Sequence, residues 1–387
     1  MENPKIRFKG FTKDWEQRKF SDIASRESIS RESSYDLPSL EYEDVIAEEG
    51  RLNKDISLKE NIKKGIVFDG SQVLYGKLRP YLHNWLNPDF SGVAVGDWWV
   101  LKPNNADKSF IYRLIQTQRF DDIANQSAGS KMPRADWNLV SNTEFAVPVS
   151  QEEQEKIGEY FSSLDHLITL HQRKCEQTKK LKKYMLQKMF PQNGAKVPEI
   201  RFNGFTHDWE QRKFGEVFQE YSEKNHPELP ALTIIQGGGT VLREESDRNL
   251  QYNKSSLSGY KMVCENDFIV HLRSFEGGLE KSNHKGLISP AYHTFHGDNV
   301  DSRFYYPYFR SYEFIKHKLV PHVYGIRDGR SIDIDGMKTI EIPYTSYEEQ
   351  KKIGDYIQSL DHLITLHQRQ CDELKKMKKY MLQNMFI

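Results

Sequence analysis

Short glycine-bearing loops with clustered basic residues are the parts of this sequence best suited to bind a ligand. In the first half, Gly76 to Pro80 (GKLRP) follows an apolar run, and a second loop spans Gly129 to Arg134. Glycine permits close backbone approach, and the arginine fork matches phosphate oxygens or the acceptor edge of guanine. The candidate contact residues are the basic side chains of these loops and of their counterparts in the second half: Lys77, Arg79, Lys131, Arg134, Arg273, Lys281, Lys285, Arg327 and Arg330. The alternative for each is a solvated loop charge.

Residues for covalent or phosphoryl chemistry are not arranged in any recognisable constellation. The sequence has no GxxxxGK[ST] phosphate loop, and its 13 histidines include no HExxH pattern. Asn87 to Phe90 (NPDF) resembles the NPPF motif of amino-methyltransferases, but it lacks the second proline and no FxGxG motif accompanies it. A turn between strands is the favoured interpretation of this segment. We therefore expect no catalytic residues in this chain.

Two histidine–cysteine pairs form the one set with metal-ligand spacing. His171 and Cys175 are four residues apart, as are His367 and Cys371, so two helices could bring them together as a Cys2His2 zinc site. The same positions continue an apolar heptad pattern, where a thiol and a paired histidine also pack well. Packing is the favoured interpretation, and no metal is expected.

Composition narrows the class of protein further. Lys+Arg and Asp+Glu both number 55 among 387 residues, so any phosphate contact must come from local patches rather than net charge. The three cysteines form no CxxC pair, which favours a reducing compartment. The first residues are charged, and no apolar run approaches 18 residues. We expect a cytoplasmic protein with no membrane association.

The chain repeats its framework twice. Pro4 to Phe20 returns as Pro198 to Phe214 with 14 of 17 positions identical, and Glu152 to Phe190 returns as Glu348 to Phe386 with 29 of 39 identical. The residues between these blocks show no comparable identity. This pattern indicates one framework that presents two different inserts, rather than a short-period solenoid.

The second repeated block predicts two long helices. Ser150 with Glu153, and Ser346 with Glu349, have the spacing of capping boxes. The apolar positions beyond each cap recur every 3.5 residues, which is typical of a coiled-coil seam. The seam, which is also the predicted helix-pair interface, comprises Ile157, Phe161, Leu164, Ile168, His171 and Cys175 in the first helix and Ile353, Ile357, Leu360, Ile364, His367 and Cys371 in the second. We expect the two helices to pack as an antiparallel coiled coil.

Identity between the helices extends beyond this seam. Among the residues that recur outside it are Asp165, His166, Thr169, Gln172 and Arg173. Solvated faces drift in sequence, so the outer faces are predicted to bind something, the same partner twice. The alternative is a recent duplication whose inserts were replaced by recombination.

The two inserts share an order of features. In the first, Gln72 to Tyr75 and Val93 to Leu101 are strand-like, and Phe110 to Phe120 is an aromatic amphipathic segment. In the second, the strand-like segments are Asp267 to Leu272 and Ala291 to Phe295, and Phe304 to Leu319 is aromatic. The predicted fold class is α/β (α+β), with two mixed α/β domains in a pseudo-twofold repeat. The predicted segments are domain 1 (1–149), helix 1 (150–190), a linker (191–197), domain 2 (198–345) and helix 2 (346–387).

The ordered repeat resembles the specificity subunit of type I restriction-modification systems. The resemblance rests on the doubled RFxGFxxxWExxxF opening, the extended approach to each helix (Phe145 to Ile157, Ile342 to Ile353), the doubled SLDHLITLHQR to KKYMLQxMF helices, and loops such as Tyr75 to Leu82. It covers essentially the whole chain. The segment Phe275 to Lys285 departs from the GKLRPYL type, so the contact residues of the second insert are less well defined.

That resemblance implies two target-recognition domains, each of which reads one part of a bipartite, asymmetric site on double-stranded DNA. The helix pair would set the spacer and dock two modification subunits, which are adenine methyltransferases that use S-adenosylmethionine. A restriction subunit, an ATP- and Mg-dependent translocase and endonuclease, would join for cleavage. The chain itself would be non-catalytic and hold no cofactor. The alternatives are a non-catalytic coiled-coil adaptor, another sequence-specific DNA-binding protein, or a single-chain restriction-methylation enzyme, for which the sequence has no motif.

Overall fold

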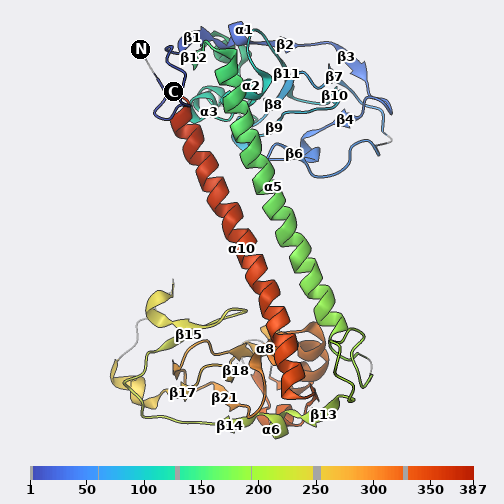
Figure 1. The fold of residues 1–387 in the computed structure, drawn as a ribbon, viewed down its shortest axis with the longest axis vertical. Helices are drawn as coiled ribbons and strands as arrows, with labels where there is room; N and C mark the ends of the chain where they lie inside the picture. Colours follow the sequence, from blue (N-terminus) through green and yellow to red (C-terminus); the bar gives the residue numbers. More distant parts are fainter. Residues whose placement is uncertain (1–2, 60, 127–130, 193, 247–253, 326–329) are drawn as a thin grey trace. The chain divides into compact units, whose positions relative to one another are not determined.

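The computed structural model describes residues 3–59, 61–126, 131–192, 194–246, 254–325 and 330–387. It divides into two compact units: unit 1 is Met1–Arg173 with Gln368–Ile387, and unit 2 is Lys174–His367. The long helices α5 (Gln151–Lys188) and α10 (Tyr347–Met385) each contribute a piece to both units (Figure 1). Their bounds agree closely with the predicted helices 150–190 and 346–387.

Unit 1 holds the first insert in two four-stranded sheets, β2-β11-β8-β9 and β3-β7-β10-β4, with short helices packed on them. Its elements are β1 (Glu16–Lys19), α1 (Phe20–Ile23), β2 (Ala24–Glu27), β3 (Ser30–Glu32), β4 (Ser39–Leu40), η1 (Tyr42–Asp44), β5 (Val45–Ile46), β6 (Arg51–Leu52), β7 (Lys64–Phe68), β8 (Val73–Gly76), η2 (Pro80–Leu82), β9 (Trp85–Leu86), β10 (Gly92–Ala94), β11 (Trp98–Pro103), α2 (Lys108–Leu114), α3 (Gln118–Ala124), α4 (Trp137–Asn142) and β12 (Glu144–Val147).

Two expected elements of this insert are each divided in the structure. The segment Val93 to Leu101 is wrong as one strand, because Gly96 adopts φ +97° and the chain passes from β10 in one sheet to β11 in the other. The aromatic segment Phe110 to Phe120 is divided between α2 and α3. Thr117 is the N-cap of α3, and its side chain accepts a hydrogen bond from the Phe120 amide at 3.3 Å. Both breaks follow local capping and turn chemistry.

Unit 2 holds the second insert, which has one four-stranded sheet, β14-β21-β18-β19, and several two-stranded pairs. Its elements are β13 (Glu210–Lys213), α6 (Phe214–Val217), β14 (Gln219–Tyr221), β15 (Leu232–Ile235), β16 (Gly239–Leu242), η3 (Arg243–Glu245), η4 (Lys254–Gly259), β17 (Lys261–Val263), β18 (Phe268–Val270), α7 (Ser274–Gly277), β19 (Glu280–Lys281), β20 (Gly286–Ile288), β21 (His293–His296), α8 (Ser302–Phe309), η5 (Glu313–Leu319), η6 (Val320–His322), β22 (Val323–Tyr324), β23 (Ser331–Ile332), α9 (Ile334–Lys338) and β24 (Glu341–Tyr344). Both inserts are mixed α/β domains, as the sequence predicts.

Each insert is closed by pairing its first strand with its last. β1 runs antiparallel to β12, with Glu16 opposite Val147, and β13 runs antiparallel to β24, with Glu210 opposite Tyr344. The repeated opening segment therefore meets the extended segment that leads into the long helix. This pairing fixes where each helix begins.

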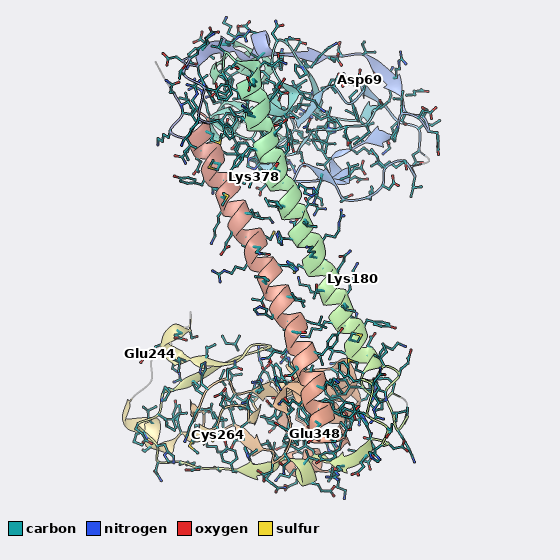
Figure 2. The ribbon with its side chains drawn as sticks, in the orientation of Figure 1. Asp69, Lys180, Glu244, Cys264, Glu348 and Lys378 are labelled. Atoms are coloured by element: carbon teal, nitrogen blue, oxygen red, sulfur yellow. The ribbon has the colours of Figure 1, made fainter. Side chains whose placement is uncertain are left out.

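The helices are antiparallel inside each unit. In unit 1 Lys378 Nζ of α10, labelled in Figure 2, lies 2.7 Å from Asp165 Oδ1 of α5. In unit 2 Lys182 Nζ lies 2.5 Å from Asp361 Oδ1, and the Cys175 thiol lies 3.8 Å from the Ile364 carbonyl. Residue numbers rise along one helix as they fall along its neighbour, so the predicted antiparallel pair is confirmed.

The ends of the helices are part of the domain cores. In unit 1, Ile157, Phe161 and Leu164 of α5 are buried together with Met385 and Phe386 at the end of α10. In unit 2, Ile353 and Ile357 of α10 are buried with Met189 and Phe190 at the end of α5. Each insert therefore packs on the start of its own helix and on the end of the other, which explains why the MLQxMF ending repeats.

The remaining seam residues differ in burial. Ile168, Cys175, Leu360 and Cys371 are buried, whereas His171, Ile364 and His367 are only half-buried. Burial of the seam therefore varies along the helices, and both cysteines are among its buried positions.

Candidate nucleic-acid interface

The two basic loops of unit 1 lie against each other. The Arg79 amide donates to the Pro133 carbonyl at 2.7 Å, and the Ala135 amide donates to the Lys77 carbonyl at 2.9 Å. Leu78 and Arg134 form an antiparallel bridge between the loops. Because backbone hydrogen bonds fix both segments, residues more than 50 positions apart in the chain form one surface.

Asp97 joins this loop pair through its side chain. Its Oδ2 accepts from Arg134 Nε at 3.1 Å and lies 2.9 Å from Arg134 Nη2, while its Oδ1 lies 3.4 Å from Lys77 Nζ. Partial burial opposes ionisation of the carboxyl, but the contacts with Arg134 and Lys77 outweigh it and keep the pKa of Asp97 below its usual value. Two of the four predicted contact residues are therefore ion-paired within the chain.

Backbone contacts hold Asp97 in place. The Lys77 amide donates to the Asp97 carbonyl at 2.9 Å, and the Tyr42 hydroxyl donates to the same carbonyl at 2.5 Å. The Tyr42 oxygen in turn accepts from the Leu78 amide at 3.1 Å. The carboxylate is consequently positioned by the loops that it bridges.

Arg79 and Lys131, the other two predicted residues of unit 1, are exposed. Arg79 adopts a left-handed backbone conformation, with φ +50°, which is uncommon for a residue other than glycine. Among the residues that the structure describes, neither side chain has a hydrogen-bonding or ionic partner. These two cations are available to an external anion.

The predicted residues of unit 2 have mixed surroundings. Arg273 is exposed at the start of α7, and the Arg330 guanidinium lies 5.3 Å from the ring centre of Phe275 in that helix. Lys281 is half-buried in β19, where its Nζ lies 3.0 Å from Asn266 Oδ1 and burial lowers its pKa. Lys285 is exposed after that strand. Arg327 lies outside the described residues.

The loop after β18 and the chain before α9 are thus joined through α7, by the contact of Arg330 with Phe275. In unit 1 the loop after β8 and the chain before α4 are joined in the corresponding places. The two units share this convergence of basic segments, although the contacts that produce it are different.

Each frame contains a buried carboxylate with several hydrogen-bond donors, which the sequence analysis did not predict. Glu153 accepts from Arg7 Nε at 2.6 Å and from Trp15 Nε1 at 3.2 Å, and Glu349 accepts from Arg201 Nε at 2.7 Å and from Trp209 Nε1 at 3.1 Å. The serine half of each predicted capping box is present, with Ser150 and Ser346 Oγ both 3.4 Å from the glutamate amide.

The glutamate side chains do not close the capping boxes, because they bind the opening motif instead. The repeated arginine and tryptophan of RFxGFxxxW were the signal that could have identified this contact. It is a framework contact, since both carboxylates are almost fully buried.

The helix pair has two flanks, one of which contacts the first insert while the other carries exposed apolar residues. Gln172, which follows the seam residue His171, and Lys375, which follows Leu374 where the heptad spacing continues, both contact Glu49 of the first insert, at 3.0 and 3.9 Å. Like flanks therefore meet, as antiparallel pairing requires. The opposite flank holds large apolar side chains that are more than a third exposed: Leu167, Met377 and Tyr380 in unit 1, and Leu181, Tyr184, Leu363 and Leu366 in unit 2.

We call these two sets the twin apolar patches. Leu167 corresponds to Leu363, and Tyr380 to Tyr184, under the same 196-residue offset that relates the helices. By contrast, Asp165 has an internal role, because it pairs with Arg113 at 2.6 Å as well as with Lys378. Some residues that repeat between the helices therefore make contacts within the chain, whereas others are exposed.

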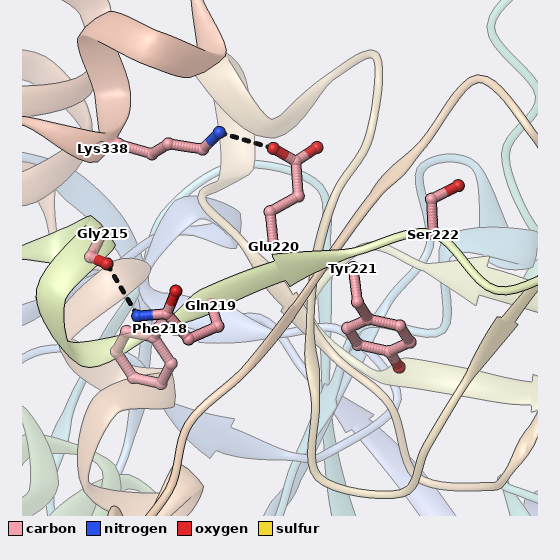
Figure 3. Close-up of a pocket in the computed structure, with 7 residues that line it drawn as sticks. All are labelled: Gly215, Phe218, Gln219, Glu220, Tyr221, Ser222 and Lys338. Carbon is pink, nitrogen blue, oxygen red and sulfur yellow. Dashed lines mark hydrogen bonds and ion pairs between the residues drawn. The ribbon is translucent and has the colours of Figure 1, made fainter.

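A shallow pocket of about 380 Å³ lies on unit 2 beside β14 and α9 (Figure 3). Lys338 points toward Glu220 within it, with Nζ 2.6 Å from Oε2, and His293 Nδ1 lies 2.7 Å from Oε1. The contacts with Lys338 and His293 outweigh the effect of burial and lower the pKa of Glu220. Its charged groups are already paired.

The described residues contain no group of three or more histidine, cysteine, aspartate or glutamate side chains arranged to hold a metal ion. The described part of the chain also has no helix long and apolar enough to cross a membrane.

Comparison with known proteins shows what this chain is similar to. Residues 12–180 match the model of the type I restriction modification DNA specificity domain. The type I restriction enzyme MjaVIII specificity subunit of Methanocaldococcus jannaschii is 26% identical over 294 residues, which cover 70% of this chain and 68% of that protein. The putative MjaX specificity subunit of the same organism is 24% identical over 298 residues, covering 72% of this chain and 68% of the relative.

A solved structure has a fold similar to that of this chain. The S subunit of a type I restriction-modification system from M. genitalium superposes with a TM-score of 0.60 at 12% identity, covering 100% of this chain and 99% of that one. The family match at 12–180 includes both basic loops of unit 1. The loops of unit 2 lie beyond it, so their assignment rests on the repeated frame.

Proposed function

We propose that this chain is the DNA-recognition subunit of a type I restriction-modification complex, in which each unit reads one part of a bipartite, asymmetric site. The observation that carries the proposal is one frame, built twice, around two inserts whose basic segments converge in corresponding places. Different inserts on one frame suit two different half-sites. Exposed Arg79 and Lys131 in unit 1, and Arg273 and Lys285 in unit 2, supply cations for phosphate or base-edge contact.

In this proposal the helix pair sets the distance between the half-sites. Helices of 38 and 39 residues are about 57 Å long at about 1.5 Å per residue. Equivalent major-groove faces of B-DNA recur roughly every 34 Å. A rigid pair of this length favours two short specified blocks around an unspecified spacer of roughly 5–8 base pairs, shorter than one helical turn.

The twin apolar patches support the docking of two copies of one partner, which we propose to be the modification (methyltransferase) subunit. Groups of exposed large apolar side chains are typical of protein-binding surfaces, and the two patches follow the internal repeat. The chain then supplies recognition and assembly, without catalysis of its own. S-adenosylmethionine would be bound by the modification subunits, and ATP and Mg by restriction subunits. The assembly would work in the cytoplasm of a bacterial or archaeal cell.

Binding and methylation assays test the proposed function. The full chain, with and without the methyltransferase subunit, is incubated with a random duplex library, and methylated adenines are mapped in cells that carry it. We expect one bipartite motif, with one target adenine per half-site on opposite strands, and no methyl transfer by the isolated chain. Methyl transfer by the pure chain, or binding with no sequence preference in the complex, would refute the proposal.

Helix length offers a second test. Four residues added beyond Arg173 and four beyond Arg369 lengthen each helix by about 6 Å, equal to nearly two base pairs of rise. We expect unaltered half-sites with a longer spacer, or loss of activity if the seam register fails. An active, correctly assembled variant with the original spacer would show that the helices do not set it.

A further inference from the structure

The turn η2 presents apolar side chains at the loop pair of unit 1. Pro80, its first residue, is buried, while Tyr81 and Leu82 are 51% and 42% exposed. Arg79 before the turn and His83 after it both have left-handed backbones, with φ of +50° and +51°. Such strain persists only where surrounding contacts impose it, and it is often found at functional sites.

Those surrounding contacts are visible on both sides of the turn. His83 stacks on Trp85 with ring centres 5.2 Å apart, and its Nε2 lies 3.0 Å from Asp121 Oδ1. On the other side, the Arg79 amide is held by the Pro133 carbonyl. The turn is therefore anchored at both ends, and Tyr81 is held outward on a fixed base.

Met132 is the second exposed apolar residue at this place. Its side chain is 47% exposed, between Lys131 and Pro133. The bridge between Leu78 and Arg134 runs antiparallel, so the chain on either side of Pro133 follows the chain that enters η2. Exposed apolar groups beside exposed cations match a ligand with an anionic backbone and apolar faces.

Asp97 separates the basic residues into two classes. It neutralises Lys77 and Arg134, the first at 3.4 Å and the second through two nitrogens. The side chains left to meet a ligand are Arg79 and Lys131, together with Tyr81 and Met132. A carboxylate at this position also repels any phosphate that is not drawn in by correct contacts elsewhere.

We infer that Tyr81 and Met132 contact base faces or thymine methyl groups and, with Arg79, determine the half-site that unit 1 reads, while Asp97 is a positioning residue that withholds Lys77 and Arg134 from unspecific phosphate contact. The inference rests on the proposed function and deepens it. It assigns specificity to apolar side chains that a search for basic residues passes over. Apolar contact with the thymine methyl group and stacking on bases are established modes of recognition.

The apolar half of the inference is tested by the double variant Tyr81→Ala, Met132→Ala in the full chain with the methyltransferase subunit. Affinity is measured for the mapped site and for an unrelated duplex over a series of salt concentrations. We expect the affinity for the mapped site to fall about tenfold and the affinity for the unrelated duplex to stay the same. The salt dependence of both should be unchanged, because no phosphate contact is removed. Tyr35→Ala, which removes another exposed tyrosine of unit 1, is the control and should leave both affinities unchanged.

The positioning role of Asp97 is tested by a variant that should raise, rather than lower, an affinity. Asp97→Asn keeps the side-chain shape but releases two cations, so affinity for the unrelated duplex should rise and the salt slope should steepen by about two. Asp97→Glu should restore the ratio of specific to unspecific binding. A merely structural carboxylate would instead give weaker binding to both duplexes.

The outcomes separate the inference from the function on which it rests. If the unaltered complex prefers no site, the proposed function fails. If the unaltered complex discriminates but the Tyr81–Met132 variant loses affinity for both duplexes equally, or for neither, the apolar contacts are excluded. Asp97→Asn with lower affinity for both and an unchanged salt slope would overturn the positioning role.

Discussion

The two units share the main contacts of their frame, but their inserts are stabilised differently. In unit 1 the Gln154 amide donates to the Pro148 carbonyl at 2.9 Å and its oxygen accepts from the Asp107 amide at 2.8 Å. In unit 2 Gln350 makes the same two contacts, with Thr345 at 2.7 Å and the Asp301 amide at 3.0 Å. The frame is therefore determined by a few buried polar residues that join strand, short helix and long helix.

The inserts show the opposite behaviour. The loop pair of unit 1 is held by backbone bonds and by Asp97, whereas in unit 2 the buried Glu280 accepts from the Tyr306 hydroxyl at 2.7 Å and from the Gly237 amide at 2.7 Å, and pairs with Arg310. Each insert has its own polar centre in an equivalent fold. This difference teaches that the frame can accept new inserts as long as the strand pairing and the glutamine contacts are kept.

Exchange of an insert is the strongest test of that comparison. Replacing residues 20–145 with the insert of another such protein keeps β1, the second half of β12 and both long helices. We expect one half of the methylated motif to change entirely and the other half to stay the same, as mapped across the genome. A change in both halves would contradict independent readers.

Removal of the buried carboxylate should disable either frame to the same degree. Glu153→Ala leaves the Arg7 guanidinium without its buried partner, and Glu349→Ala does the same to Arg201. We expect each to lower the free energy of unfolding of its own unit by about 3 kcal/mol. Hydrogen exchange measured separately for the two units is the readout. Clearly unequal losses in the two altered units would show that the frames are not equivalent.

Glycine in the first turns of the helices should distinguish the frames. A Cβ at Gly158 would lie 2.4 Å from Ser109 Cβ, whereas one at Gly354 would lie 3.1 Å from Arg303 Cβ. We expect Gly158→Ala to destabilise unit 1 by about 1–3 kcal/mol through overpacking. Gly354→Ala should be about neutral, because a gain in helix propensity of about 1 kcal/mol offsets the tighter contact. Chemical denaturation of both variants measures the change in the free energy of unfolding. Equal losses in the two variants would contradict the predicted order.

A pH dependence restricted to unit 2 gives the smallest effect. His296 Nδ1 lies 2.6 Å from Asp267 Oδ1, and this contact, with Asp298 near the other nitrogen, raises the pKa of His296. Since the folded pKa is raised, the stabilisation is complete below the ordinary histidine value of about 6.5 and is lost as pH rises through the folded pKa.

Solvent screening of this half-exposed pair should keep the effect below about 1 kcal/mol. His296→Gln should reduce the pH dependence of the unfolding free energy of unit 2, as obtained from hydrogen exchange corrected for the intrinsic effect of pH, with unit 1 in the same sample as the control. A pH dependence as large as that of the unaltered chain would assign the effect to another group.

Several features could be predicted from residues alone because they depend on local pattern. The 3.5-residue period from Ile157 and Ile353 located both long helices, and the serine caps at Ser150 and Ser346 located their starts. The strand before the GKLRP loop was also predicted near its observed position, β8. Repetition added the pairing of equivalent segments, which a single copy would not have indicated.

Other features depend on contacts between distant segments. A linear pattern gave Val93 to Leu101 as one strand, but Gly96 redirects the chain into a second sheet. The capping-box spacing was correct for Ser150, yet Glu153 binds Arg7 and Trp15 because their side chains arrive from the opening segment. Spacing along the chain identifies the local partners that a side chain could bind. Only the packed structure shows that a distant segment supplies the partners that it does bind.

The sequence by itself determined the duplicated frame, the two helices and the position of the basic loops, since periodicity and repetition are properties of the chain. Only the tertiary structure decided which cations remain available, because Asp97 lies 37 residues from Arg134 and reaches it through folding. It also decided that the last residues of each helix enter the core of the other insert, because burial of Phe190 and Phe386 requires an apolar surface that their own segment does not contain.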